Sequence, residues 1–319
     1  MFYIKNLIFV ALLVTQTACP QRSDNQRVAT ESRDVAPADQ LMATTGNLLP
    51  YNLDAPSAVF DLDASLNEIS GLSMSPNAAQ LAAVQDERGQ LFLIDKKTGK
   101  STPSVTFQEE GDFEGIEFVG DTLWCLKSSG KLFKIWNWQK KPFDMAVFKI
   151  AELKTANLEG LGYDAKNHRL LLAAKGEKDD GLWSRTVYAF DLRKQTPSVI
   201  PAFSVSLTDF QTFLKGKTDK RYEKLITDYV TAPKTTGFDF GPSGIAVHPI
   251  SGNIYVLSHF NKTLVVLSPS GKVLEMAKLD KTKFVQPEGL CFDADGTMYI
   301  SSEIKDQPAA RLSAFKMKK

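Results

Sequence analysis

The stretch Asn67–Asp95, with the sequence NEISGLSMSPNAAQLAAVQDERGQLFLID, sets the pattern for most of this chain. Three short apolar runs follow a start rich in small residues, and polar turn-forming residues separate the runs. Short runs rich in apolar and β-branched residues, bounded by Ser, Pro, Asn, Asp and Gly, are typical of antiparallel strands. The stretch therefore predicts three strands joined by tight turns.

The same pattern returns four more times and can be aligned on one glycine. The aligned segments are Glu68–Leu72, Asp112–Ile116, Asn157–Leu161, Gly241–Ile245 and Gln286–Leu290. Successive glycines are 44, 45, 84 and 45 residues apart (115−71, 160−115, 244−160, 289−244). A repeat of this length with several strands is typical of propeller blades. We expect each glycine in the innermost strand of a blade, where neighbouring backbones approach closely.

We therefore predict an all-β fold, a five-bladed β-propeller over residues 57–319. The long interval contains Leu207–Val230, whose apolar residues follow helical spacing and predict two short helices, capped near Thr208 and Thr218, between blades three and four. The alternative is a degenerate sixth blade in that interval. Ala58–Leu62 should pair with Arg311–Phe315 and close the ring, which removes exposed sheet edges.

Composition and charge exclude one class of partner. The 319 residues are 43% apolar and 24% charged, with 38 Lys and Arg against 37 Asp and Glu. This balance gives no field that would attract nucleic acid or anionic lipid. We expect no nucleic-acid partner, contact with a membrane only through an N-terminal anchor, and a monomer that binds a small molecule or another protein.

The N-terminus predicts export. Residues 1–19 contain an early lysine and an apolar run, Leu7–Val14, that is too short to span a bilayer. Thr17-Ala18-Cys19 resembles a bacterial lipoprotein signal, which implies lipidation of Cys19 and an extracytoplasmic, membrane-anchored protein of the cell envelope. The alternative is an ordinary cleaved signal and a secreted or periplasmic protein. Residues 20–56 are polar and predict a flexible linker. Two further cysteines, Cys125 and Cys291, should be buried free thiols.

Strand geometry brings a set of polar residues to one face of the ring. The start of each first strand and the end of each second strand lie on the same face, because the two strands are antiparallel. The predicted ligand-binding residues are Glu68, Asp86, Lys127, Lys175, Ser243 and His259, and the predicted metal ligands are Glu114, Glu159, Glu288 and Glu303. Oxygen ligands of this kind suit calcium. We therefore predict an acidic, calcium-binding site on the propeller axis.

Other interpretations of these residues stay open. Glu114, Glu159 and Glu288 could instead accept backbone N–H bonds from the next blade and hold blades together. His259 either faces a ligand or packs in the interior, while His168 and His248 fall in turns and should be solvated. No nucleophile or metalloprotease motif appears in the chain. We therefore expect a binding module, with a metal-dependent hydrolase of the lactonase or phytase type as the alternative and a structural scaffold, with the helical insert as partner surface, as a third.

Several of these segments together resemble one family. They are Glu68–Leu72, Phe113–Gly115, Leu158–Leu161, Leu257–His259, Pro287–Leu290 and Met298–Glu303, in this order. The set resembles the SdiA-regulated (YjiK-like) β-propeller family over roughly Ala58 to Phe315. The resemblance implies a bacterial extracytoplasmic propeller without an established common activity. The insert at Leu207–Val230 looks longer than the connection of that family.

Overall fold

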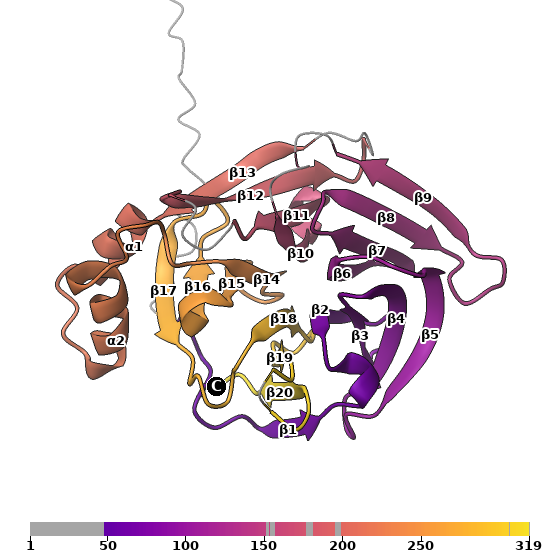
Figure 1. Cartoon of the computed structure of the whole chain (residues 1–319), viewed down its shortest axis with the longest axis horizontal. Helices are drawn as coiled ribbons and strands as arrows, with labels where there is room; N and C mark the ends of the chain where they lie inside the picture. Colours follow the sequence, from indigo (N-terminus) through magenta and orange to yellow (C-terminus); the bar gives the residue numbers. More distant parts are fainter. Residues whose placement is uncertain are drawn as a thin grey trace, which may run out of the picture. The chain divides into compact units, whose positions relative to one another are not determined.

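The computed structural model describes residues 48–150, 153, 157–176, 181–194, 199–305 and 307–318. The predicted signal peptide, Cys19 and most of the predicted linker lie outside these ranges. Within them, no helix is both long and apolar enough to cross a membrane. Figure 1 shows five four-stranded sheets around a common centre, with β2, β6, β10, β14 and β18 innermost.

Each sheet is an antiparallel meander and forms one blade. Blade 1 contains β2 (Ile69–Met74), β3 (Gln80–Gln85), β4 (Arg88–Asp95) and β5 (Ser101–Gln108), and blade 2 contains β6 (Phe113–Val119), β7 (Thr122–Lys127), β8 (Lys131–Trp136) and β9 (Asp144–Lys149). Blade 3 contains β10 (Leu158–Asp164), β11 (Arg169–Ala174), β12 (Ser184–Asp191) and β13 (Ile200–Ser206), and blade 4 contains β14 (Pro242–Val247), β15 (Ile254–Ser258), β16 (Thr263–Leu267) and β17 (Val273–Lys278). Blade 5 contains β18 (Pro287–Phe292), β19 (Met298–Ser302), β20 (Arg311–Phe315) and, outermost, β1 (Ala58–Asp61). The five predicted blades are confirmed, and the six-blade alternative is wrong.

The aligned glycines lie where adjacent innermost strands meet. A Cβ built on Gly115 would lie 2.5 Å from the Cβ of Leu161 in the next blade, a separation that packed side chains do not tolerate. A Cβ on Gly289 of blade 5 would lie 2.6 Å from the Cβ of Leu72 in blade 1. The last blade therefore touches the first, and the ring is closed.

Strand pairing between the two ends of the described chain completes blade 5. β1 pairs antiparallel with β20, in a register that places Ala58 opposite Ala314 and Asp61 opposite Arg311. The predicted pairing of Ala58–Leu62 with Arg311–Phe315 is confirmed. Cys125 and Cys291 are buried free thiols, as predicted.

The insert between blades 3 and 4 is helical. It contains α1 (Leu207–Leu214), a 3-10 turn (Lys220–Tyr222), α2 (Glu223–Ile226) and a π-helical turn (Thr227–Thr231). The predicted caps are wrong by one or two residues. Ser206 caps α1 in a reciprocal pair with Asp209, and Asp219 caps the 3-10 turn.

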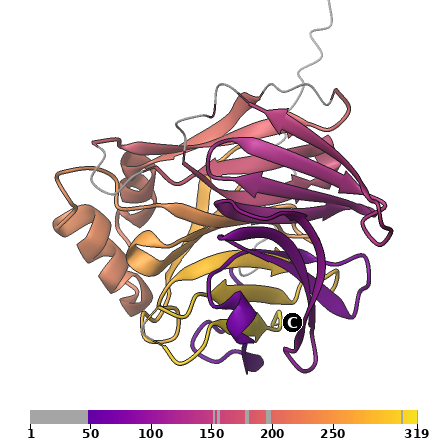
Figure 2. The ribbon, with the colours of Figure 1, turned by 45° about the vertical axis from the view of Figure 1, so that its right-hand side comes forward.

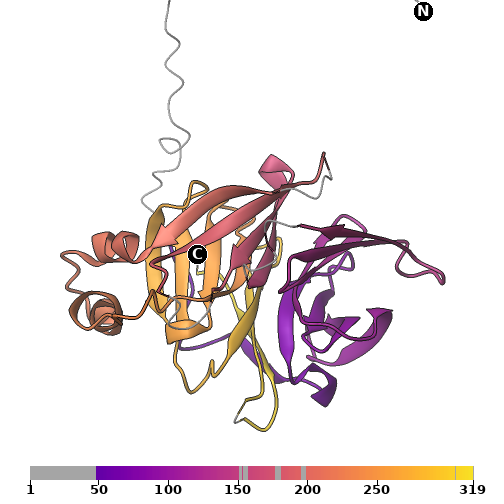
Figure 3. The ribbon, with the colours of Figure 1, turned by 45° about the horizontal axis from the view of Figure 1, so that its top comes forward.

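The insert covers the outer edge of blade 4. Figures 2 and 3 show α1 and α2 outside strand β17, away from the centre of the ring. Phe210 and Tyr229 from the insert pack edge-to-face in the core beside Phe238. The hydroxyl of Tyr222 donates a 2.7 Å hydrogen bond to Oε1 of Glu275 on β17. The insert therefore shields an edge strand that would otherwise be open to pairing.

The chain before β1 packs on blades 4 and 5. Tyr51 is 5% exposed, its hydroxyl donates to the Gly296 carbonyl at 2.6 Å, and it lies 2.9 Å from Nε2 of His248. The hydroxyl of Tyr255 donates to the Leu48 carbonyl at 3.1 Å. The structure thus differs from the linker prediction over Leu48–Pro56. The expectation that His248 is solvated is wrong, because Tyr51 covers the ring and leaves His248 3% exposed.

Candidate functional site

A β-bulge at the same position of every blade builds the centre of the site. In blade 2, Phe113 pairs with Lys127 but Gly115 pairs with Leu126, so Glu114 is an extra residue in β6. The residues at this position in the other blades are Ser70, Glu159, Ser243 and Glu288. A bulge bends the strand and redirects the side chain of the extra residue. Five redirected side chains therefore lie at the same level of the ring.

The two bulge serines connect neighbouring blades. Ser70 Oγ donates to the Phe113 carbonyl of blade 2 at 2.5 Å. Ser243 Oγ donates to the Pro287 carbonyl of blade 5 at 2.7 Å. Both serines are at most 2% exposed. Sequence analysis predicted Ser243 as a ligand-binding residue, but the structure uses its hydroxyl to join two blades.

The bulge glutamates make different contacts. Oε1 of Glu159 forms a 3.0 Å ion pair with Nζ of Lys175, which follows β11. Oε1 of Glu288 lies 2.7 Å from Nδ1 of His259. The other carboxyl oxygen of Glu288, Oε2, is buried and has no hydrogen-bond partner in the described chain, and the residue is 3% exposed. The alternative of backbone N–H bonds to the next blade is not seen for these glutamates in the described residues.

The carboxyl groups of the site repel one another in a poorly hydrated place. Burial, followed by repulsion from Glu159 and Glu288, raises the pKa of Glu114 to about 10. Burial, followed by repulsion from Glu288, Glu68 and Asp86, raises the pKa of Glu303. Burial is also the main cause that raises the pKa of Glu159 and of Glu288. These mutual effects show that the glutamates of blades 2, 3 and 5 occupy one site.

Cationic and neutral groups face the glutamates from blades 3 and 4. Burial, followed by the charges of Lys262 and Lys175, lowers the pKa of His259 to about 3, so the imidazole is neutral. With its hydrogen on Nδ1, this ring donates to the Glu288 carboxylate. Lys262, in the turn Phe260–Lys262, donates from Nζ to the His259 carbonyl at 2.9 Å. Sequence analysis missed Lys262, although its place three residues after His259 was visible.

The remaining predicted residues lie around this centre. Glu303 is 9% exposed and accepts a hydrogen bond from Gln286. Asp86 has a buried Oδ1 without a hydrogen-bond partner among the described residues, and burial followed by repulsion from Glu68 raises its pKa to about 6. Nζ of Lys127 lies 5.1 Å from the centroid of the Phe113 ring. Glu68 is not the bulge residue of blade 1, since Ser70 takes that place.

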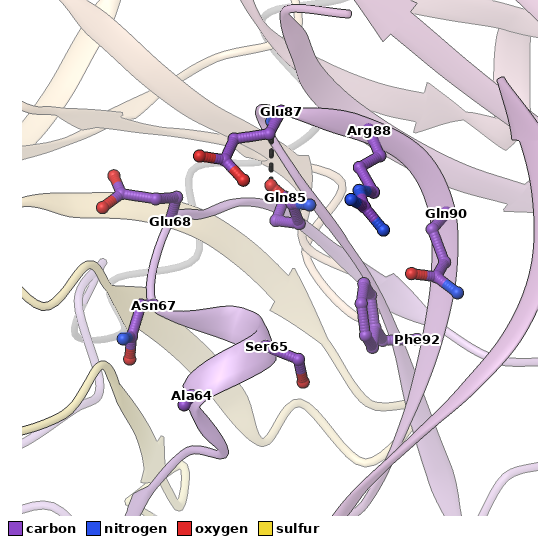
Figure 4. Close-up of a pocket in the computed structure, with 9 residues that line it drawn as sticks. All are labelled: Ala64, Ser65, Asn67, Glu68, Gln85, Glu87, Arg88, Gln90 and Phe92. Carbon is purple, nitrogen blue, oxygen red and sulfur yellow. Dashed lines mark hydrogen bonds between the residues drawn. The ribbon is translucent and has the colours of Figure 1, made fainter. Parts of the chain in front are cut away.

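A hollow of about 370 Å³ opens on blade 1, and Glu68 lies at its edge. Figure 4 shows the segment Ala64–Asn67 on one side and the side chains of Arg88, Gln90 and Phe92 from β4 on the other. Oε1 of Gln85 accepts a 2.8 Å hydrogen bond from the Glu87 amide at one end. The charge of Glu68 also helps to raise the pKa values of Glu303 and Asp86. The hollow therefore borders the axial site.

A pre-arranged metal cage is not seen in the described residues. No group of three or more His, Cys, Asp or Glu side chains there is arranged to hold a metal ion. The carboxyl groups interact through charge across the site, and among the described residues only Glu159 and Glu288 of these groups have a basic partner within ion-pair distance. The prediction of calcium, and that of a metal-dependent hydrolase, both stay predictions.

Several solved structures are similar to this chain at low sequence identity. Streptogramin B lyase is 11% identical, with a TM-score of 0.43 over 82% of this chain and 73% of that one. PQQ-bound aldose sugar dehydrogenase from Streptomyces coelicolor is 12% identical, with a TM-score of 0.46 over 82% and 99%. A chain of the nidogen/laminin complex is 14% identical, with a TM-score of 0.45 over 73% and 72%. At these identities the likeness concerns the fold alone.

Comparison by sequence identifies the family. No protein of curated function matched the sequence significantly. The profile of one family matches residues 57–180 and 232–306, which include the innermost strands of all five blades. The stretch between the two matched ranges contains the helical insert. On this evidence the chain belongs to the SdiA-regulated family.

Proposed function

We propose that this propeller is a binding module whose axial site, formed by the bulge glutamates and their neighbours, takes up a positively charged ligand. Calcium or an organic ammonium group would supply that charge. The observation that carries the proposal is the buried Oε2 of Glu288, an acceptor that the described residues leave without a donor. A buried polar atom without a partner costs about 1–3 kcal/mol, and a ligand that donates to it or coordinates it removes this cost.

The carboxyl groups around Glu288 support a cation in particular. Burial and mutual repulsion raise the pKa values of Glu114 and Glu303, so these groups hold protons near neutral pH when no ligand is present. A cation among them offsets the repulsion and favours the ionised forms. Binding is therefore expected to release protons, which is a signature that adsorption to exposed carboxylates lacks.

The experiment measures that release directly. The folded protein, in unbuffered sodium chloride solution at pH 7.5, is titrated with calcium chloride or with methylammonium chloride while a pH-stat records the base consumed. We expect saturable proton release with at least one cation, together with a rise in the thermal midpoint. Absence of both effects with both cations would refute the proposal.

Variants assign the release to the axial site. Glu114→Gln removes the carboxyl group with the most strongly raised pKa and should reduce the number of protons released. Glu110→Gln makes the same chemical change at an exposed position of the chain just before β6 and should leave the release unchanged. Equal release from both variants would contradict the assignment to this site.

The cellular setting belongs to the same proposal. We propose that the domain works outside the cytoplasm, held at the envelope by a lipid on Cys19. This rests on the sequence pattern before residue 20. Metabolic labelling with a radioactive fatty acid should mark the native protein and fail to mark Cys19→Ser.

A further inference from the structure

The axial site also contains a cation without an anionic partner. Lys262 is half-buried, and no carboxylate of the described chain lies within ion-pair distance of its Nζ. Its contact is the uncharged carbonyl of His259. Burial, followed by the charge of Lys305, lowers the pKa of Lys262, and Glu288 only partly opposes this effect. The ammonium group of Lys262 therefore has too little negative charge around it to balance its own charge.

The charged groups of the axial site are divided unequally among the blades. Blade 1 contributes the acidic residues Glu68 and Asp86, whose charges help to raise the pKa of Glu303. Blade 4 contributes no carboxylate to these interactions, and its groups there are Lys262 and the neutral imidazole of His259. In a closed ring of five, blades 1 and 4 are not neighbours. A ligand in the axial site therefore meets Lys262 of blade 4 as well as the carboxyl groups of the other blades.

The neighbouring lysines add positive charge and do not balance the charge of Lys262. Lys175 is already paired with Glu159, and Lys278 is paired with Asp228. Both of these cations, with Lys305, act to lower the pKa of Lys262. Glu288 interacts with Lys262 through charge but lies beyond ion-pair distance, and its Oε2 has no hydrogen-bond partner among the described residues. One unsatisfied acceptor and one uncompensated cation thus lie in the same site.

We propose that the ligand of this site is dipolar, with an ammonium group held by the glutamates and a carboxylate held by Lys262. This inference rests on the proposed function and narrows it to amino acids and related zwitterions. A ligand with both groups satisfies the acceptor and compensates the cation at once. An amine alone would add positive charge near Lys262, and an acid alone would add negative charge near the glutamates.

The test compares matched pairs of compounds by isothermal titration calorimetry. Glycine, 4-aminobutanoate and 6-aminohexanoate are each compared with the alkylamine that lacks the carboxylate, namely methylamine, propylamine and pentylamine. We expect at least one amino acid to bind tenfold or more tightly than its amine. Equal or tighter binding of all three amines would overturn the dipolar ligand while leaving the proposed cation site in place. Absence of binding by all six compounds, and by calcium, would overturn both.

Lysine variants show which residue holds the carboxylate. In Lys262→Met the preference for the amino acid over its amine should fall below twofold, with amine binding unchanged or stronger. Lys262→Arg keeps a cation and should keep the preference. Lys272→Met removes an exposed lysine before β17 and serves as the control. A tenfold preference that survives in Lys262→Met would overturn the role of this lysine, and the circular dichroism spectrum shows whether the variant is folded.

Discussion

At the bulge position, blades 1 and 4 carry serine and blades 2, 3 and 5 carry glutamate. Where the bulge residue is serine, its short hydroxyl reaches the carbonyl of the next blade and joins the two sheets. Where it is glutamate, the longer side chain extends into a shared site with other carboxyl groups. The repeat fixes the place and direction of the side chain, and the residue type decides whether it joins two blades or enters the shared group of carboxyls.

The largest effect should come from removing both serine hydroxyls. Ser70→Ala and Ser243→Ala each leave a buried carbonyl without its donor, at about 1–3 kcal/mol. The two lie in different blade interfaces, so their effects should add. We expect the double variant to lose about 2–6 kcal/mol in the free energy of unfolding, measured by urea denaturation. Ser104→Ala, at an exposed position of β5, should change little. A double variant as stable as the wild type would contradict the claim that the two serine hydroxyls stabilise the fold by joining neighbouring blades.

The next effect concerns the one bulge glutamate that has a lysine partner. Lys175→Met leaves Glu159 buried without its ion pair, and breaking such a pair costs about 3 kcal/mol. The loss should be largest at pH 8 and smaller at pH 5, because at pH 5 the Glu159 carboxyl binds a proton and no longer needs the cation. Urea denaturation at the two pH values measures the difference. The same loss at both would mean that Lys175 stabilises the fold by packing rather than by charge.

Glu114→Gln should act in the opposite direction from the serine variants. The pKa of Glu114 is raised from 4.5 to about 10, so the folded chain binds this proton more tightly than the unfolded chain does. The wild type therefore loses stability as the pH rises from about 4.5 towards about 10. Glutamine is neutral without binding a proton, so it avoids the cost of keeping this carboxyl group protonated, and we expect a gain of about 2 kcal/mol at pH 8 and none at pH 4. Glu110→Gln should follow the wild type at every pH.

The smallest effect is expected at the border of the site. Burial, followed by repulsion from Glu68, raises the pKa of Asp86 from 3.8 to about 6, so its ionisation weakens the fold between these values. Asp86 is partly solvated, which reduces the energy involved. Asp86→Asn should gain about 1 kcal/mol at pH 8 and nothing at pH 3.5. A loss at pH 8 would show that the Asp86 carboxylate is stabilised by contacts in the fold.

Much of this architecture could be predicted from local sequence. The glycine of each repeat marks a close approach between backbones, so its spacing counted the blades and gave the order of the ring. The same alignment also contained the bulge position, as the residue before each glycine. Glu68 is predicted as a ligand-binding residue at the start of its strand, whereas the residue that precedes the aligned glycine there is Ser70.

Other features depend on residues far apart in the chain. Tyr51 is buried by His248, Tyr255 and Phe292, so nothing near Tyr51 in the sequence indicated that the linker ends before it. The choice of Ser206 over Thr208 as a cap follows from the reciprocal bond with Asp209 and from the end of β13. Whether a bulge residue joins blades or enters the shared site of carboxyl groups depends on side-chain length and on the next blade.

One measurement tests the central claim most directly: the thermal midpoints of Ser70→Ala and Glu114→Gln at pH 8, each compared with the wild type. The two residues share one backbone position in adjacent blades. Our account predicts a lower midpoint for Ser70→Ala and a higher one for Glu114→Gln. A lower midpoint for both would contradict it, because the glutamate would then serve the fold as the serine does.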